Sequence, residues 1–230
     1  MKRIYFALWL SLCAFSSNAQ TTKDIFDPDS RITWLGIDFS HVTLIGNFAE
    51  FYDVGAKSSV QIITDYFPKW NRIILDEREK YDIRGMLRRM DIDYDIDMIM
   101  DHNYWADPDS MESYNTRRFT GEDIQAFVDQ YNLEGREGIG VVFIAESLNK
   151  CYEEAYFHFV AMDMKTGEVI FHKRLRGEPS GFGLRNYWAN SVYRIIKDIK
   201  YYYYPRWKAN IEGDEPPSAW MFQIQITSFD

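Results

Sequence analysis

Apolar and polar residues along the chain follow the patterns of a sheet that is covered by helices. The stretch 32–39 is rich in β-branched and aromatic residues and predicts a first strand. After Ser58, a helix-capping residue, apolar side chains recur every three or four positions, as on a helix that packs against a sheet. They are Val60, Ile63, Phe67, Trp70 and Ile74. Pro68 should kink or split this helix, with a fresh turn beginning at the proline.

The middle of the chain predicts one strand, one short helix and then three strands in succession. Residues 91–98 alternate acidic and apolar side chains, which predicts a strand with one buried face. Thr120-Gly121-Glu122-Asp123 resembles a capping box with Asp in place of Glu and should begin a short helix. We expect the three strands at 139–145, 152–162 and 168–175. Lys165-Thr166-Gly167 should form the turn of an antiparallel hairpin.

The last clear element is an amphipathic helix over about 186–204. Its apolar stripe is Trp188, Val192, Ile195, Ile199 and Tyr202. Pro205 is expected to end it, and 221–226 alternates well enough for a final edge strand. The predicted fold class is α/β with an α+β tendency: a mixed sheet with a late antiparallel hairpin and helices packed on it.

The amino terminus has the pattern of a secretory signal peptide. Lys2 and Arg3 precede an apolar run over 4–15, and Ser17-Asn18-Ala19 offers small residues for cleavage after Ala19. We therefore expect a periplasmic or secreted protein, with residues 1–19 as signal peptide. Residues 20–30 would form a polar leader and 31–230 a single domain. No later stretch is long and apolar enough to predict a membrane span.

Cysteine usage limits the chemistry that is open to the chain. Cys13 ends the apolar run, which suggests a lipoprotein as an alternative, but Leu12 stands where a lipoprotein signal needs Gly, Ala or Ser. After cleavage, Cys151 would be the only cysteine, so an internal disulfide is impossible. A lone cysteine can also be a nucleophile, although a packed or unpaired thiol is the simpler interpretation.

Charge and motif spacing exclude several function classes. The 230 residues carry 26 Lys and Arg against 35 Asp and Glu, a net charge of −9, which disfavours nucleic acid and anionic lipid as partners. No serine-hydrolase elbow, phosphate-binding loop or complete dinucleotide fingerprint occurs. No cofactor and no catalytic residue are therefore predicted.

Two patterns invite a metal hypothesis. The run Asp91, Asp93, Asp95 and Asp97 resembles the start of a calcium loop, but the glycine and the closing glutamate of such a loop are missing. A solvated strand face explains the same run. His158 and His172 would approach each other across the hairpin, with residues near 158 opposite residues near 173. Ordinary strand histidines are the alternative, and no metal site is predicted.

The densest unusual cluster is Gly181 to Trp188. It combines two glycines with the candidate binding residues Arg185, Asn186, Tyr187 and Trp188 at the start of a helix. A cation, an amide and two aromatic rings together suit a recognition surface. In the alternative interpretation the glycines make a turn, Asn186 caps the helix and Trp188 fills the core.

Three segments together resemble an uncharacterised family of secreted proteins from Gram-negative gut-type bacteria. They are Tyr66-Phe67-Pro68-Lys69-Trp70-Asn71, Gly138-Ile139-Gly140-Val141-Val142-Phe143-Ile144 and Gly181 to Ala189. More distantly, the element order and the hairpin Asp163-x-x-Thr166-Gly167-Glu168-Val169 resemble the α/β domain of the TolB amino-terminal region and of curli-secretion lipoproteins. The resemblance implies an envelope binding or assembly role without catalysis, and it carries over no functional residue.

The sequence thus favours a non-enzymatic interaction or assembly module of the cell envelope, which binds an envelope protein or its own copies. A hydrolase of envelope polymers is one alternative, with Asp38, Glu77 or Asp101 as candidate carboxylates. A glycan-binding module is another, because aromatic residues make up 17% of the chain and Tyr201 to Tyr204 form a run.

Overall fold

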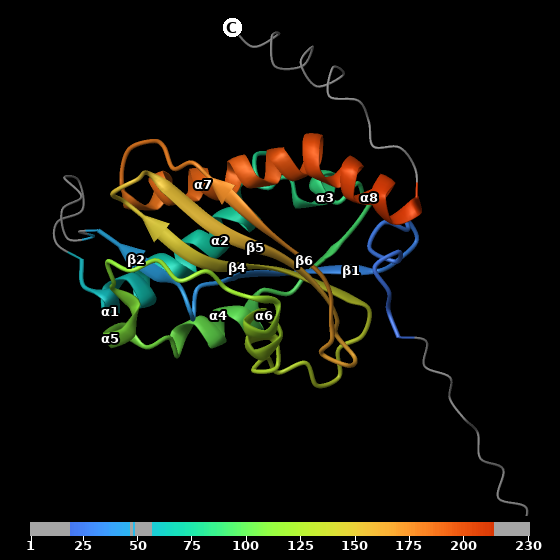
Figure 1. Ribbon diagram of the computed structural model, residues 1–230, viewed down its shortest axis with the longest axis horizontal. Helices are drawn as coiled ribbons and strands as arrows, with labels where there is room; N and C mark the ends of the chain where they lie inside the picture. The colour runs from blue at the N-terminus through green and yellow to red at the C-terminus, as the bar shows by residue number, and fades with distance from the viewer. Residues whose placement is uncertain (1–18, 47, 49–56, 214–230) are drawn as a thin grey trace, which may run out of the picture.

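The fold is a mixed six-stranded sheet with helices on both faces. The computed structural model describes residues 19–46, 48 and 57–213. Strand order is β3-β1-β4-β5-β6, and β2 also pairs with β4. The strands are β1 (Ile32–Asp38), β2 (Thr43–Ile45), β3 (Asp93–Tyr94), β4 (Ile139–Asn149), β5 (Glu154–Asp163) and β6 (Val169–Gly177). Figure 1 shows the long strands β4, β5 and β6 between the two helical layers. The predicted fold class is confirmed.

The sheet is parallel in its first half and antiparallel in its second. Strands β1, β2 and β3 run parallel to their partners, whereas β4, β5 and β6 form two antiparallel pairs. Both β1 and β2 pair with β4, at Ile32–Asp38 and then at Thr43–Ile45. Residues 39–42 therefore leave the sheet between two strands that share one neighbour.

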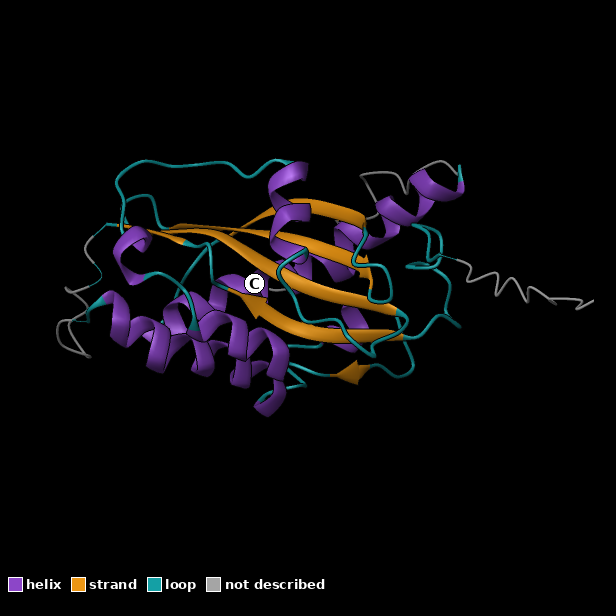
Figure 2. Cartoon of the chain, turned by 90° about the horizontal axis from the view of Figure 1, so that it is seen from below, coloured by secondary structure: helices purple, strands orange, loops and turns teal. Residues whose placement is uncertain are grey.

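The larger hydrophobic core lies between the sheet and a layer that contains α2 (Phe67–Asp76), α3 (Ile83–Met86), α7 (Leu184–Asp198) and α8 (Tyr204–Glu212). The opposite face carries α6 (Gly121–Val128) and part of α4 (Asp97–Tyr104), which enclose a smaller core. The short helices α1 (Ser59–Gln61) and α5 (Pro108–Met111) lie at one end of the molecule (Figure 1). Figure 2 shows the twisted sheet between these helices.

Two buried asparagines replace a neighbouring strand along part of β1. Because β3 pairs only with Thr33 and Trp34, no described strand pairs with the rest of this edge of β1. The Asn71 side chain accepts from Ile37 N and donates to Ile37 O, at 2.7 and 2.9 Å. Asn103 likewise accepts from Phe39 N and donates to Ile37 O, at 2.6 and 2.8 Å. Helices α2 and α4 are thereby fixed to the strand, since buried backbone groups need partners.

Pro68 and Pro205 each follow a π-helical turn. Helix α2 comes after the turn Ile62–Tyr66, and α8 comes after Ile199–Tyr203. Pro68 and Pro205 are the second residues of α2 and α8, within the first helical turn, where a missing N–H costs little. The fresh turn expected at Pro68 is confirmed, as is the Ser58 cap, which forms a capping box with Gln61. The prediction that Pro205 ends the helix is wrong, because the helix continues to Glu212.

The strand predicted over 91–98 is also wrong for most of its length. Only Asp93 and Tyr94 pair in the sheet, and α4 begins at Asp97. Ile96 and Ile99 are buried and lie three positions apart, which is helical spacing. Asp97 lies in the first turn of α4, where a negative charge is favourable. The acidic and apolar residues of 91–98 are therefore divided between a two-residue strand and the start of α4.

The segment predicted as a polar leader packs against the sheet and helices. Ile25 and Phe26 are buried, and the Phe26 ring contacts Phe171 and Tyr204. Thr22 donates a hydrogen bond to the backbone oxygen of Ile170 in β6 at 2.8 Å. Residues from Gln20 onward therefore belong to the folded body.

Several predictions fall on residues outside the described part of the chain. They are the signal peptide up to Asn18 with Cys13, and the edge strand at 221–226. Within the described residues, no helix is both long and apolar enough to cross a membrane.

Candidate functional site

A buried carboxylate lies at the end of β1, just before residues 39–42 leave the sheet. Asp38, the last residue of β1, is fully buried and accepts hydrogen bonds from the Tyr131 hydroxyl at 2.6 Å and from Ser40 N at 2.8 Å. Burial raises the pKa of Tyr131 well above its ordinary value, and the Asp38 carboxylate raises it further. The phenol therefore keeps its proton and acts as a fixed donor to Asp38.

Two histidines meet beside this carboxylate. The His41 ring stacks on Phe127 at 3.8 Å, and the His102 ring packs edge-on against Tyr131 at 5.2 Å. Their own centroids lie 6.4 Å apart. Burial lowers the pKa of His41, although the Asp38 charge opposes the effect, so the site favours the neutral imidazole. Ser40 Oγ, His41 Nε2 and His102 Nε2 are buried without a hydrogen-bond partner among the described residues.

Next to His102 lies a hollow of about 350 Å³. We call it the Trp105 hollow. Met98 and Tyr131, its most buried lining residues, form the base. Trp105 follows the last residue of α4 and is 82% exposed, and Tyr104 beside it is 62% exposed. The polar lining consists of Asp97, Asp101, His102, Gln130, Asn132 and Arg136. An exposed indole beside planar polar side chains is an arrangement suited to binding.

The hollow carries a negative charge balance. Asp97 and Asp101 lie four residues apart on α4, and neither makes an ion pair with another described residue. Arg136, its one guanidinium, is already paired with Asp95, Nη2 to Oδ2 at 3.0 Å. Two carboxylates are thus left without a counter-ion at the surface.

Other hollows lack this combination of features. The one around the loop 133–137 and the turn 165–167 is larger, about 520 Å³, but no exposed aromatic side chain lines it. A second, of about 340 Å³, lies on the His41 side and is lined by Arg117 and Phe119. Phe119 there is buried and belongs to the smaller core.

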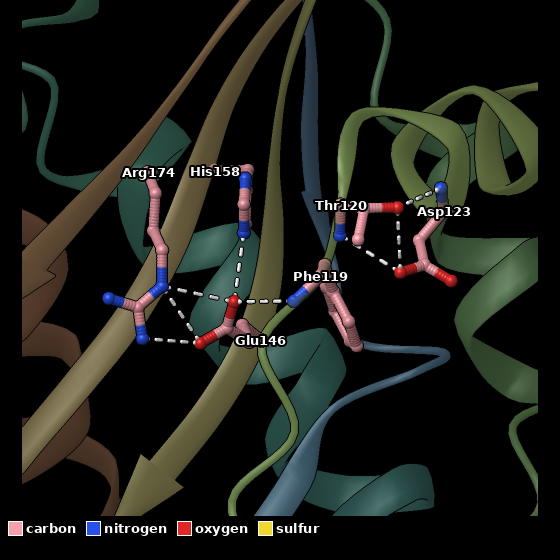
Figure 3. A network of polar contacts seen from close by, with 6 residues as sticks. All are labelled: Phe119, Thr120, Asp123, Glu146, His158 and Arg174. Atoms are coloured by element: carbon pink, nitrogen blue, oxygen red, sulfur yellow. Dashed lines mark hydrogen bonds and ion pairs between the residues drawn. The ribbon is translucent and has the colours of Figure 1, made fainter.

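A second polar cluster lies on the same face of the sheet, around Glu146. The β4–β5 register shifts between Ala145 and Ser147, so Glu146 occupies a bulge that turns its side chain toward β6 and the segment before α6. It accepts hydrogen bonds from His158 Nε2 at 3.0 Å, from Arg174 Nη2 at 2.6 Å and from Phe119 N at 3.0 Å (Figure 3). Glu146 and His158 are 2% and 1% exposed.

The Glu146 cluster is a structural clamp. Burial alone would raise the pKa of Glu146, but the hydrogen bonds from His158, Arg174 and Phe119 N outweigh it and hold the pKa at about 2. The carboxylate, ionised at neutral pH, joins β4, β5 and β6 to the chain just before α6. Thr120 and Asp123 then form the predicted capping box, which is confirmed (Figure 3).

The predicted binding cluster lies at the start of α7, in the other helical layer. Arg185 is half-buried, pairs with Glu77 at 3.5 Å and accepts a hydrogen bond from Trp70 Nε1 at its backbone oxygen. Trp188 is 2% exposed and stacks on Phe48 within the larger core. Tyr187 is half-buried and Asn186 exposed. Gly183 takes the cap position, so the interpretation of Asn186 as the helix cap is wrong.

The three carboxylates of the hydrolase alternative have separate environments. Asp38 is buried with Tyr131, Glu77 pairs with Arg185 and Lys80, and Asp101 is exposed in the Trp105 hollow. No hydrogen bond joins any two of them among the described residues. Burial raises the pKa of Asp198, which lies on α7 in the other helical layer.

The histidine pair of the hairpin does come together. His158 lies opposite Arg174 and Phe159 opposite Lys173, as expected for this hairpin, and the His158 ring stacks on His172 with the centroids 6.1 Å apart. His158 is bound to Glu146, so the pair belongs to the clamp. No group of three His, Cys, Asp or Glu side chains within the described residues could hold a metal. Cys151 is exposed and free.

The sequence did not indicate Trp105 as a binding residue, although Asp97 entered the calcium hypothesis and Asp101 the hydrolase alternative. The available signal was Tyr104-Trp105 immediately before Ala106-Asp107-Pro108, two aromatic residues at a helix end that precede a turn. The sequence predicts a helix that ends at these two residues only if Asp97 is taken as its first residue.

Comparison with known proteins adds no assignment to this geometry. No protein-family model matches the chain, and neither the curated proteins nor the solved structures contain a significant match.

Proposed function

We propose that the protein is an exported, non-enzymatic recognition module of the cell envelope that binds through the Trp105 hollow. The observation that carries this proposal is Trp105, which lines a polar hollow and is 82% exposed. The ring of Tyr104, which is 62% exposed, contacts the Trp105 ring. An exposed aromatic ring that lines a polar hollow suits recognition, because aromatic residues are enriched at the centres of binding surfaces.

The carboxylates favour binding over hydrolysis as the activity. Glycoside hydrolysis by two carboxyl groups needs a nucleophile or base and a proton donor with a raised pKa, both at one site. Glu146 instead has a pKa of about 2, and both of its carboxylate oxygens accept hydrogen bonds within the clamp. Asp38 likewise accepts two internal hydrogen bonds. Export rests on the signal-peptide pattern of residues 1–19.

Two measurements test the proposal. The mass of the native protein should correspond to a chain that begins at Gln20. That chain should co-sediment with purified envelope fractions, and Trp105→Ala should lose this binding. Tyr152→Ala is the matched control, because Tyr152 is 75% exposed and does not line the Trp105 hollow. A native chain that keeps residues 1–19, or no co-sedimentation with any envelope fraction, would contradict the proposal.

A further inference from the structure

The Trp105 hollow combines features that distinguish between classes of ligand. One flat, exposed ring at its edge offers a large apolar face, while the side chains around it offer hydrogen bonds in several directions. Such a site suits a ligand that is itself apolar on one face and rich in hydroxyl groups at its edges. A pyranose ring has this character, since its axial C–H groups gather on a face and its equatorial hydroxyls project outward.

The polar lining has the correct chemistry for hydroxyl groups. Carboxylates of Asp97 and Asp101 accept from O–H donors, and the amide of Asn132 both donates and accepts. Arg136 is held by Asp95 and by the backbone oxygen of Asn132, at 3.0 Å in each case. A guanidinium fixed in advance can donate to a ligand hydroxyl with little further loss of conformational entropy.

The charge balance selects among saccharides. Two unpaired aspartates repel an anionic sugar, because an opposing carboxylate would be brought close to them in a partly dehydrated hollow. Neutral and amino sugars escape this repulsion. A volume of about 350 Å³ at the surface lies at the low end of small-ligand sites, which fits one or two sugar rings of a longer chain.

We infer that the Trp105 hollow is a saccharide subsite that stacks a neutral or amino pyranose on Trp105 and accepts its hydroxyl hydrogens at Asp97 and Asp101. This inference rests on the proposed function and names its ligand class. The ring that stacks best is β-linked with equatorial substituents, as in polymers of glucose or N-acetylglucosamine.

The test is calorimetric titration of the chain from Gln20 onward with three trisaccharides. The probes are the neutral trimer of N-acetylglucosamine, the cationic trimer of glucosamine and the anionic trimer of galacturonic acid. The neutral and cationic trimers should bind, and the anionic trimer should bind at least tenfold more weakly. Trp105→Ala should lower the affinity for the neutral trimer at least tenfold, whereas Tyr152→Ala should leave that affinity unchanged. Trp105→Tyr should restore part of the affinity.

A double variant tests the role of the carboxylates separately. Asp97→Asn with Asp101→Asn should reduce the discrimination against the anionic trimer, because amides keep the hydrogen bonds but remove the charge. Folding of each variant is checked by its urea midpoint. If envelope binding depends on Trp105 but neither the neutral nor the cationic trimer binds, the saccharide assignment is overturned and the proposed function stands. Absence of envelope binding would overturn the proposed function itself.

Discussion

At the scale of single residues, Gly36 shows how a close contact dictates a residue type. Its φ is +108°, and a Cβ there would lie 2.6 Å from Asn71 Oδ1, the atom that accepts from Ile37 N. A side chain would therefore both strain the backbone and displace the asparagine that completes the β1 edge.

We expect Gly36→Ala to lower the free energy of unfolding by about 3 kcal/mol, from strain together with a lost buried hydrogen bond. Gly135→Ala is the control, because Gly135 also has a positive φ, +74°, but nothing lies within 4 Å of its Cβ position. It should cost about 1 kcal/mol from strain alone. Urea denaturation measures both, and equal losses would contradict the role given to the Asn71 contact.

Glu146 makes the stability of the protein depend on pH. Its pKa falls to about 2 from an ordinary 4.5, so the native state favours the ionised form. A depressed carboxyl pKa contributes stability that is complete above about pH 4.5 and is lost as the pH falls toward 2.

Glu146→Gln should cost about 3 kcal/mol at pH 7, since it leaves the Arg174 guanidinium facing a neutral side chain in a mostly buried site. The difference between wild type and variant should shrink as the pH falls from 4.5 to 2. Urea midpoints across this pH range measure it. A difference that does not change with pH would show that the charge of Glu146 does not contribute.

At the scale of elements, periodicity predicted most helices and strands but failed where a helix changes its winding. Trp188, Val192, Ile195 and Ile199 are buried as expected. The π-helical turn at Ile199–Tyr203 then adds a residue to one turn, so the buried stripe continues at Tyr204 and Trp207. Tyr202, expected in the stripe, is 38% exposed. No rule of fixed period locates such a turn.

The capping box of α6 was identified from four residues, because its hydrogen bonds are local. Thr120 Oγ1 accepts from Asp123 N, and the Asp123 carboxylate accepts from Thr120 N. We expect Thr120→Ala to cost about 1 kcal/mol and Thr120→Ser much less, since serine keeps the acceptor. Thermal unfolding of both variants checks this, and equal losses would contradict a capping role of the hydroxyl.

At the scale of the whole molecule, the fold class followed from element order, while the site did not. The hydrogen bonds of the Glu146 clamp span up to 28 positions each, and the bond from Tyr131 to Asp38 spans 93. Such contacts depend on strand register and on bulges, which composition and spacing do not determine. The sequence directed attention to Arg185 through Trp188, whereas the exposed aromatic pair beside a polar hollow lies at Tyr104 and Trp105.

Hydroxyl-radical footprinting of the protein, free and bound to purified envelope, tests the central claim most directly. Tyr104 and Trp105 should become protected, while the exposed rings of Tyr152 and Phe182 should stay as reactive as in the free protein. Unchanged reactivity at Trp105, with protection at Phe182 and Tyr187 instead, would contradict the assignment and move the binding surface to the start of α7.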